Sequence, residues 1–311
     1  MISGEDKERI RNILKNAGAS AVGFAKAGKV DTHVNSEYSE WVRDGYAGEM
    51  QYLDRHISLR NDTDNVLQNA RTVISLAFNY HPKEWRVDSL PVVACYAYGE
   101  DYHIVIRDLL KKAISELKNT YGGKWRLCVD SAPLSERYWA VKSGIGIRGE
   151  NGSVIVDGCG TYAFLAELLT TIEISPDNGE LRKCDGCGVC MKACPAQALL
   201  GNGKIDATRC INYLSIEKRG EFNAGEEELL RKGKGYLYGC DTCLRVCPHN
   251  RDIPTTQIEA FSLIDEIKSI TPEEILGLSE EEFIKKYRRS PLSYAGHRRL
   301  LRNARILKSK Y

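Results

Sequence analysis

The first half of the chain alternates between helical and strand-like patterns of apolar residues. A capping pattern at Ser3 and Asp6 precedes apolar residues at helical spacing from Ile10 to Ala17, and Gly18 fits the end of that helix. Short apolar runs then predict strands, with further helical patterns between them. The expected strands are Ala21–Ala25, Thr72–Phe78, Val92–Tyr98, Arg126–Val129, Ser153–Val156 and Tyr162–Ile174, and the expected helices are Ile104–Leu117 and Ser135–Lys142. This alternation predicts a mixed helix and sheet domain of the α/β type, whose strand order the pattern does not reveal.

The pattern changes at a turn-rich stretch, Ser175–Gly179. Residues 180–255 are rich in cysteine and show little apolar periodicity, so bound metal would hold a fold there more than a core would. The segment after Pro254 is helical and charged. We therefore expect three parts, which are a catalytic domain over 1–175, a metal-binding domain over 176–255 and a helical, basic segment over 256–311.

The net charge of +2 hides a strong asymmetry. The segment 285–311 contains ten lysines and arginines and no acid, so its +10 leaves −8 for the rest of the chain. A run of this kind is usually a solvated face, and its alternative role is contact with nucleic-acid phosphates. The ten cations are Lys285, Lys286, Arg288, Arg289, Arg298, Arg299, Arg302, Arg305, Lys308 and Lys310.

The compartment follows from the N-terminus and the cysteines. The first residues show no apolar export signal, and no apolar run approaches the roughly 18 residues that span a bilayer. We therefore expect a cytoplasmic protein with no membrane partner. Eight of the eleven cysteines lie between Cys184 and Cys247. In a reducing compartment such clustering indicates metal ligation rather than disulfides.

The first cysteine run, from Cys184 to Pro195, has the spacing of bacterial ferredoxins. In that pattern the first three cysteines bind one 4Fe–4S cluster and the fourth binds the other cluster. Gly186 and Gly188 permit the tight turns that bring the thiolates together. A zinc site is the alternative, but four cysteines this close do not all reach one tetrahedral ion comfortably.

The second run, Cys240 to Pro248, holds the last three cysteines of the same motif, and Leu237 stands where the first would be. Cys210 is the unassigned cysteine of this region and is expected to supply the missing thiolate, although it could be a buried structural thiol. The interlocked pattern predicts two clusters. The first has ligands Cys184, Cys187, Cys190 and Cys247, and the second has Cys194, Cys210, Cys240 and Cys243.

The remaining cysteines, Cys95, Cys128 and Cys159, fit no motif and are expected to be buried structural residues. Two clusters form a relay for single electrons. A ferredoxin would end there, but this chain joins the relay to about 175 further residues. We infer that the electrons are used within the same chain.

Several other motifs occur in a characteristic order between and around these runs. They are Tyr96–His103, Val129–Pro133, Gly144–Asn151, Cys210–Leu214 and Ser290–Ala304. Together with the cysteine runs they resemble the epoxyqueuosine reductases over almost the full chain. Two departures stand out, because longer members continue into a C-terminal helical-repeat extension, and because Arg148 replaces the usual lysine of the glycine-rich loop.

The resemblance implies an α+β or α/β fold, with a cobalamin-binding domain related to nitroreductases and reductive dehalogenases before a ferredoxin-like domain. It implies cobalamin and two 4Fe–4S clusters as cofactors, and an external low-potential electron donor. The implied substrate is tRNA whose wobble base is epoxyqueuosine, and the reaction removes the epoxide oxygen as water to leave queuosine. The modified base is expected to swing out of the anticodon stack.

The resemblance also implies residue roles. Asp130 ends a predicted strand and is the candidate proton donor for the epoxide oxygen, while its alternative role is helix capping. Tyr102 and His103 match active-site positions of the family, with Asp101 and Arg137 in support, although a histidine at a helix start is often unremarkable. The expected cobalamin contacts are Arg55, Asp130, Ser153, Asn212, Arg219, and the backbone near Cys240 and Asp241.

The stretch Gly144–Gly149 formally matches a dinucleotide-binding fingerprint, but a helical pattern precedes it and a strand follows, which is the wrong order. We expect a flexible loop there that touches cobalamin or tRNA phosphate. Two alternatives to the whole interpretation are another corrinoid iron–sulfur reductase of the dehalogenase type and a non-catalytic ferredoxin-type electron carrier.

Overall fold

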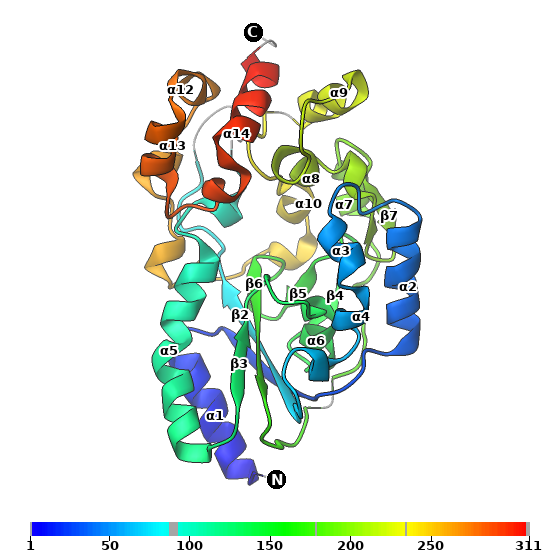
Figure 1. Ribbon diagram of the computed structural model, residues 1–311, viewed down its shortest axis with the longest axis vertical. Coiled ribbons are helices and arrows are strands. Elements are labelled where there is room, and N and C mark those ends of the chain that lie inside the picture. The colour runs from blue at the N-terminus through cyan, green and yellow to red at the C-terminus, as the bar shows by residue number, and fades with distance from the viewer. Residues whose placement is uncertain (1, 87–92, 178, 234, 309–311) are drawn as a thin grey trace.

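The computed structural model describes residues 2–86, 93–177, 179–233 and 235–308. A four-stranded sheet forms its centre, in the order β1-β2-β6-β3 (Figure 1). All three neighbouring pairs are antiparallel, so within the expected mixed class the sheet is of the α+β kind. The strands are β1 Ala21–Lys26, β2 Thr72–Asn79, β3 Trp125–Cys128 and β6 Ala163–Thr170.

Helices cover both faces of this sheet. One face packs on α1 (Gly4–Asn16) and α5 (Tyr102–Tyr121), and alternate residues of β2 such as Ile74 and Leu76 belong to that core. The opposite face packs on α6 (Glu136–Lys142). Every residue of β2 is therefore buried, which explains why the sequence shows a continuous apolar run rather than alternation.

Three further helices and a hairpin complete this part of the chain. None of the three helices was predicted from the sequence, because none of them has a buried residue and two of them are only 5 and 4 residues long. They are α2 Thr32–Arg43, α3 Gln51–Arg55 and α4 Ile57–Arg60, and the hairpin pairs β4 Gly146–Arg148 with β5 Val154–Val156.

The cysteine-rich segment contains short elements joined by turns, as its composition predicts. A small hairpin pairs Leu199–Gly201 (β7) with Lys204–Ile205 (β8). Its helices are α7 Val189–Ala193, α8 Ile211–Ile216, α9 Ala224–Lys232 and α10 Thr242–Arg245. Single 3₁₀ turns lie at Thr63–Asn65 (η1), Cys95–Ala97 (η2), Ala207–Arg209 (η3), Pro248–Asn250 (η4) and Glu259–Phe261 (η5).

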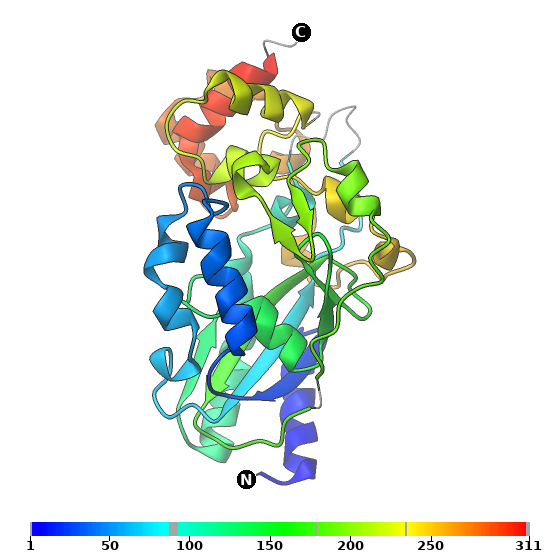
Figure 2. The same ribbon diagram turned by 90° about the vertical axis from the view of Figure 1, so that its right-hand side faces the viewer.

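Four helices follow at the end opposite α1 and the N-terminus, as both ribbon views show (Figures 1 and 2). They pack their apolar residues, among them Phe283 and Leu300, into the same core as α1 and α5. The three-part division of the chain stays a prediction, since this core is shared between its first and last parts. The helices are α11 Asp265–Lys268, α12 Pro272–Gly277, α13 Glu280–Tyr287 and α14 Leu292–Lys308, with a kink at Gly296.

One predicted strand is wrong. Of Val92–Tyr98, Val92 lies outside the described residues, Val93 makes a single bridge to Tyr238, and Cys95–Ala97 forms the 3₁₀ turn η2. The apolar run arises because this segment is buried between the sheet domain and the cysteine-rich segment. Within the described part of the chain, no helix is long and apolar enough to span a bilayer.

The basic segment is not uniformly a solvated face. Arg302 is 4% exposed and donates hydrogen bonds to the carbonyls of Leu214, Lys218 and Gly220, while its guanidinium lies 3.7 Å from the ring centroid of Phe222. Asn303 beside it donates to two further carbonyls. Arg302 therefore holds α14 against the cysteine-rich segment, whereas most other described cations of this run are exposed.

We predict that Arg302→Met lowers the free energy of unfolding by about 3 kcal/mol, because it leaves buried carbonyls without donors. The matched control is Arg298→Met, an exposed position on the same helix, which should change it by less than about 0.5 kcal/mol. Urea denaturation measures both. Equal stabilities of the two variants would show that the Arg302 hydrogen bonds are dispensable.

Candidate active site and cluster sites

Asp130 lies just beyond β3, at the sheet edge where α5 begins (Figure 1). Its backbone has a φ of 55°, a left-handed conformation that is uncommon for a residue other than glycine. Its carboxylate accepts a 2.6 Å hydrogen bond from the Tyr102 hydroxyl, and its side chain remains 60% exposed. The carboxylate is therefore held in place but open to a ligand.

His103 lies between two carboxylates. Its Nδ1 is 2.8 Å from Asp101 Oδ1 and its Nε2 is 3.5 Å from Asp130 Oδ2. Asp101 also caps α5, since Oδ1 accepts from the His103 backbone N–H. Burial lowers the pKa of His103, but Asp101 and Asp130 outweigh it and raise that pKa to about 9. The ring is thus an imidazolium at neutral pH.

The same contacts determine the charge on Asp130. The His103 ring, opposed by burial and helped by Tyr102 and Arg137, lowers the pKa of the Asp130 carboxyl. At neutral pH the two side chains together hold one removable proton, and it resides on His103. The structure thus brings together the five predicted catalytic residues, which are Asp101, Tyr102, His103, Asp130 and Arg137.

The capping alternative for Asp130 does not apply. Helix α6 begins after Ser135, and the Asp130 carboxylate points to Tyr102 instead. The Tyr102 ring is fixed by stacking on Phe164 of β6, with ring centroids 4.3 Å apart and planes 7° apart. The hydroxyl is therefore aimed at Asp130 by an aromatic contact on the central strand.

A second pair of carboxyl groups lies behind Asp130, and the sequence analysis missed it. Glu136 Oε1 accepts a 2.6 Å hydrogen bond from the Asp130 backbone N–H. Glu167, on β6 opposite Cys128, is fully buried, and neither of its carboxyl oxygens has a hydrogen-bond partner among the described residues. Burial and the charge of Asp130 raise the pKa of Glu136 to about 8, and burial and Glu136 raise that of Glu167. The sequence signal for this pair was Glu167, an acid in the middle of the apolar run 162–174.

The four thiols predicted for the first cluster surround one cavity of about 150 Å³. They come from Cys184, Cys187, Cys190 and Cys247, so the second cysteine run reaches back to the first as the interlocked pattern predicts. The Glu150 backbone N–H donates to Cys184 Sγ at 3.4 Å. Among the described residues no three Cys, His, Asp or Glu side chains converge closely enough to hold a single ion.

The other four thiols form a second group. Burial, followed by the nearby thiols of Cys240, Cys210 and Cys194, raises the pKa of Cys243. Cys210 therefore faces the other three rather than standing alone, although its role as a ligand stays a prediction. Cys194 Sγ accepts from the Ala198 N–H at 3.3 Å, which resembles the donor contact at Cys184.

A short row of aromatic rings extends from the predicted catalytic residues. Tyr102 stacks on Phe164, whose centroid lies 4.3 Å from that of Tyr80. Burial raises the pKa of Tyr80, and the nearby groups that raise it further include the thiols of Cys95 and Cys243. The row therefore runs from Tyr102 toward the region that contains these two thiols.

Residues from both ends of the chain lie near Asp130. Burial, and then the charges of Glu217, Tyr294 and Asp130, raise the pKa of Tyr52, so these groups from α3, the end of α8, α14 and the Asp130 loop lie near one another. In Figure 1, α8 and α14 lie beyond the sheet edge at which β3 ends. The surroundings of Asp130 therefore include acids and tyrosines.

The predicted cobalamin contacts are distributed around this region. Arg55 and Arg219 are exposed, and Asn212 Oδ1 lies beside Gly239, next to Cys240. The Asp241 carboxylate is buried and already accepts from Tyr236 and the Cys95 N–H. Ser153, by contrast, lies beside Asn151 at the first thiol cavity. Cys95, Cys128 and Cys159 are buried, as predicted.

The expectation of a flexible loop over Gly144–Gly149 is wrong, because part of this stretch is a strand. Gly146–Arg148 is strand β4, which pairs with β5, and Arg148 also bonds to the backbone of Arg182 and Cys184. The turn that follows lines the first thiol cavity. The glycines serve close packing here, because a Cβ on Gly146 would lie 2.6 Å from the Ile155 carbonyl.

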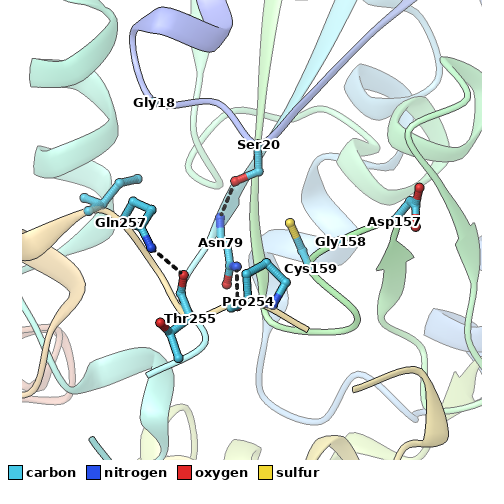
Figure 3. Close-up of a pocket in the computed structure, with 10 residues that line it drawn as sticks. Gly18, Ser20, Asn79, Asp157, Gly158, Cys159, Pro254, Thr255 and Gln257 are labelled. Carbon is cyan, nitrogen blue, oxygen red and sulfur yellow. Dashed lines mark hydrogen bonds between the residues drawn. The ribbon is translucent and has the colours of Figure 1, made fainter. Parts of the chain in front are cut away.

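A cavity of about 260 Å³ lies elsewhere, at the ends of β1 and β2 (Figure 3). The sequence assigned no role to Asn79. Its backbone N–H donates to Ser20 Oγ and its Nδ2 donates to the Pro254 carbonyl. These bonds attach the segment after η4 to the sheet. None of the predicted site residues lines this cavity, so we interpret it as a packing gap between the sheet and the segment after η4 rather than as a reaction site.

Comparison with known proteins agrees with this geometry. The family of 4Fe-4S double cluster binding domains matches residues 183–250, and the family described as epoxyqueuosine reductase QueG, DUF1730, matches residues 60–131. An epoxyqueuosine reductase from Cyclobacterium marinum is 35% identical over 97% of this chain and 98% of its own length. The chain belongs to the epoxyqueuosine reductase family. It is accordingly an oxidoreductase that carries a 4Fe–4S domain.

Other members of the family agree. The epoxyqueuosine reductase of Escherichia coli is 35% identical over 97% of this chain and 81% of its own length. The structure of the Streptococcus thermophilus enzyme matches with a TM-score of 0.85 and 29% identity, over 97% of this chain and 80% of that one. A family structure with an epoxyqueuosine-modified tRNA-Tyr stem loop matches with a TM-score of 0.86 and 28% identity, at the same coverage. The expected fold is thereby confirmed.

We predict that Asp101→Asn lowers the pKa of His103 from about 9 toward its ordinary value of 6.5, because one of its two carboxylates is lost. In the wild type, the stabilising effect of the His103 charge is complete below pH 6.5 and is lost as the pH rises through 9. NMR titration of the histidine ring measures this, with Asp108→Asn on the exposed side of α5 as the control. An unchanged pKa would exclude the Asp101 contact.

We also predict that Glu167→Gln flattens the pH dependence of stability. The folded wild type keeps Glu136 protonated up to about pH 8, and burial keeps Glu167 protonated well above its ordinary range, whereas the unfolded chain releases both protons near 4.5. Its free energy of unfolding therefore falls as the pH rises above 4.5. Between pH 5 and 8 the variant should gain about 1 kcal/mol or more relative to wild type. Urea denaturation at several pH values tests this, with exposed Glu173→Gln as the control. Parallel curves would contradict a buried protonated pair.

Proposed function

We propose that the chain reduces epoxyqueuosine to queuosine at the wobble position of tRNA, with Asp130 as the proton donor. The observation that carries the proposal is the Asp130 site, in which one exposed carboxylate lies beside an imidazolium. Family membership supplies the substrate, because a solved relative holds an epoxyqueuosine-modified stem loop. The reaction needs two electrons and two protons and releases water.

We assign the cluster ligands as the interlocked pattern predicts, with Cys184, Cys187, Cys190 and Cys247 around the first cluster. The second is held by Cys194, Cys210, Cys240 and Cys243. When bound, the clusters would transfer single electrons from an external low-potential donor. The thiols fit this group because they are soft donors, and two of them already accept backbone N–H groups that favour charge on sulfur.

Cobalamin, the cofactor that the family resemblance implies, would supply the two-electron chemistry at cobalt. The side chains of Asn212 and Arg219 suit such a group, since they offer amide and guanidinium contacts to its polar periphery. The second thiol group borders the same region, with Gly239 beside both Asn212 and Tyr96. Gly239 itself has a φ of 74° and no room for a side chain, because a Cβ would lie 2.6 Å from that of Ala94.

The protein's own contribution is the proton. An epoxide oxygen leaves poorly as an alkoxide, so an acid must protonate it as the carbon–oxygen bond breaks. At neutral pH His103 holds the proton and Asp130 is a carboxylate. Enclosure by substrate would remove water from Asp130 and raise its pKa, so the proton can pass from His103 to Asp130 and on to the oxygen. Tyr102 holds the accepting oxygen at 2.6 Å throughout.

The Asp130 loop can also move. A Bacillus subtilis relative, 27% identical with a TM-score of 0.85, was solved with its catalytic aspartate loop swung out of the active site. In this chain Asp130 is held by three contacts, from Tyr102, His103 and Glu136, and its side chain is exposed. We infer that closing this loop assembles the proton donor after the base has entered.

The basic segment would bind the tRNA backbone. Its exposed side chains include Lys285, Arg288, Arg298, Arg305 and Lys308, while Lys310 lies outside the described residues. Arg302 is excluded from this role by its burial, and Lys286 and Arg289 are paired with Glu274 and Glu100. Phosphate binding by the remaining cations should weaken with salt.

We predict that Asp130→Asn retains the clusters and cobalamin but lowers turnover by about 10²–10⁴-fold, because the amide cannot donate the required proton. Anaerobically reconstituted protein would be incubated with epoxyqueuosine-containing tRNA and a strong reductant, and the nucleosides identified by mass spectrometry. The matched control is Asp157→Asn, an exposed position at the cavity of Figure 3, which should turn over normally.

Normal product formation by Asp130→Asn would remove Asp130 from the role of acid. Absence of product from the wild type, when it holds both clusters and cobalamin, would reject the proposed substrate. Iron content and the cobalamin absorption spectrum report loading separately from turnover, so the two failures are distinguishable.

A further inference from the structure

The turn after β4, residues 149–152, lies beside the proposed site of the first cluster. The Gly149 N–H donates to the Ser153 carbonyl at 2.8 Å, and the Gly152 N–H donates back to the Gly149 carbonyl at 3.0 Å. Glu150 Oε2 accepts from the Asn202 N–H at 2.6 Å, which attaches the turn to the hairpin of β7 and β8. This closed turn belongs to the sheet domain, yet it lines the cavity of the first four thiols.

Asn151 in this turn has an unused donor. Its side chain is 4% exposed, and its Oδ1 accepts from the Ser153 N–H at 3.1 Å, which defines the orientation of the amide. Its Nδ2 is buried and has no acceptor among the described residues. Gly149 leaves space for this amide, since a Cβ there would lie 2.7 Å from Oδ1. A buried N–H without a partner costs stability, so such a group usually marks an absent acceptor.

The cavity that Asn151 lines points to sulfur as that acceptor. The neighbouring Glu150 N–H already donates to Cys184 Sγ at 3.4 Å. Adding an electron to a 4Fe–4S cluster increases negative charge on its sulfurs, and hydrogen bonds to those sulfurs stabilise the reduced form. A second donor from the same turn would therefore make the first cluster easier to reduce.

We propose that the Asn151 side-chain amide donates a hydrogen bond to a sulfur of the first cluster and raises its reduction potential. The inference rests on the proposed ligands of that cluster. It gives the sheet domain a direct role in the electron path, because the tuning donor comes from outside the cysteine-rich segment. The turn thereby assists reduction of the first cluster by an external donor.

The test compares two variants in the full chain with both clusters reconstituted. Asn151→Leu removes donor and acceptor at similar volume. Asn151→Thr keeps an oxygen that can accept from the Ser153 N–H but removes the amide donor. In both, we expect the oxidised-to-reduced ratio of the first cluster at a fixed potential to rise about tenfold, which is about 59 mV for one electron. Redox titration followed by EPR measures this ratio.

Two further variants separate the possible failures. Cys184→Ser identifies which EPR signal belongs to the first cluster, and Asn16→Leu at the exposed end of α1 is the matched control. A wild-type reduction potential in both Asn151 variants would overturn the proposal, because the residue would then not affect the first cluster. A wild-type potential in Asn151→Thr alone would also overturn it, because the residue would then act only by holding the turn. If Cys184→Ser changes neither signal, the ligand assignment itself fails, whatever the Asn151 variants show.

Discussion

The antiparallel pairing of β6 with both β2 and β3 positions nearly every group of the proposed site. Cys128 at the end of β3 pairs with Glu167, so the chain beyond it emerges beside Phe164 and the start of α5. Asp130 then meets Tyr102, whose ring stacks on Phe164 of the same central strand. Phe164 and Glu167 point to different faces of the sheet, and a shift of β6 by one residue in this register would move each of them to the other face. The catalytic geometry is therefore a property of strand register.

The register also explains why carboxyl groups whose pKa values shift in opposite directions lie so close together. Asp130 and Asp101 are partly open to solvent and face an imidazolium, so their pKa values fall. Glu136 and Glu167 are enclosed between α6 and the sheet, where burial and neighbouring carboxyl groups outweigh the nearby Arg60 and Arg137, so their pKa values rise. The Glu136 carboxyl contacts the Asp130 backbone rather than its side chain. The proton that substrate can reach is therefore held beside Asp101 and Asp130, whereas the protons on Glu136 and Glu167 stay in the protein interior.

Much of this could be read from the sequence. The eight thiols, their interlocked grouping, the first helix with its Ser3 cap, and the central strands all follow from local spacing and periodicity. The hidden acids could not be assigned, because Glu136 and Glu167 are 31 positions apart and only strand pairing joins them. The segment 93–98 was misread as a strand because burial between two parts of the chain produces the same apolar run as a sheet does. Arg302 was grouped with phosphate-binding cations for a similar reason, since composition cannot distinguish a buried guanidinium from an exposed one.

The connection between the sheet and the cysteine-rich segment has a consequence for electron transfer. Arg302 and Asn303 of α14 donate to the carbonyls of Leu214 and Ser215 in α8 and to that of Leu237, which lies three residues before Cys240. At the other side, Arg148 binds the backbone that leads into Cys184. Electron transfer slows steeply with distance, so a relay works only if its centres stay in fixed positions relative to the site of use. Arg148 attaches the first cysteine run to the hairpin of β4 and β5, and α14 attaches the second run to the core that it shares with α5, so the fold holds the thiol groups in fixed positions relative to Asp130.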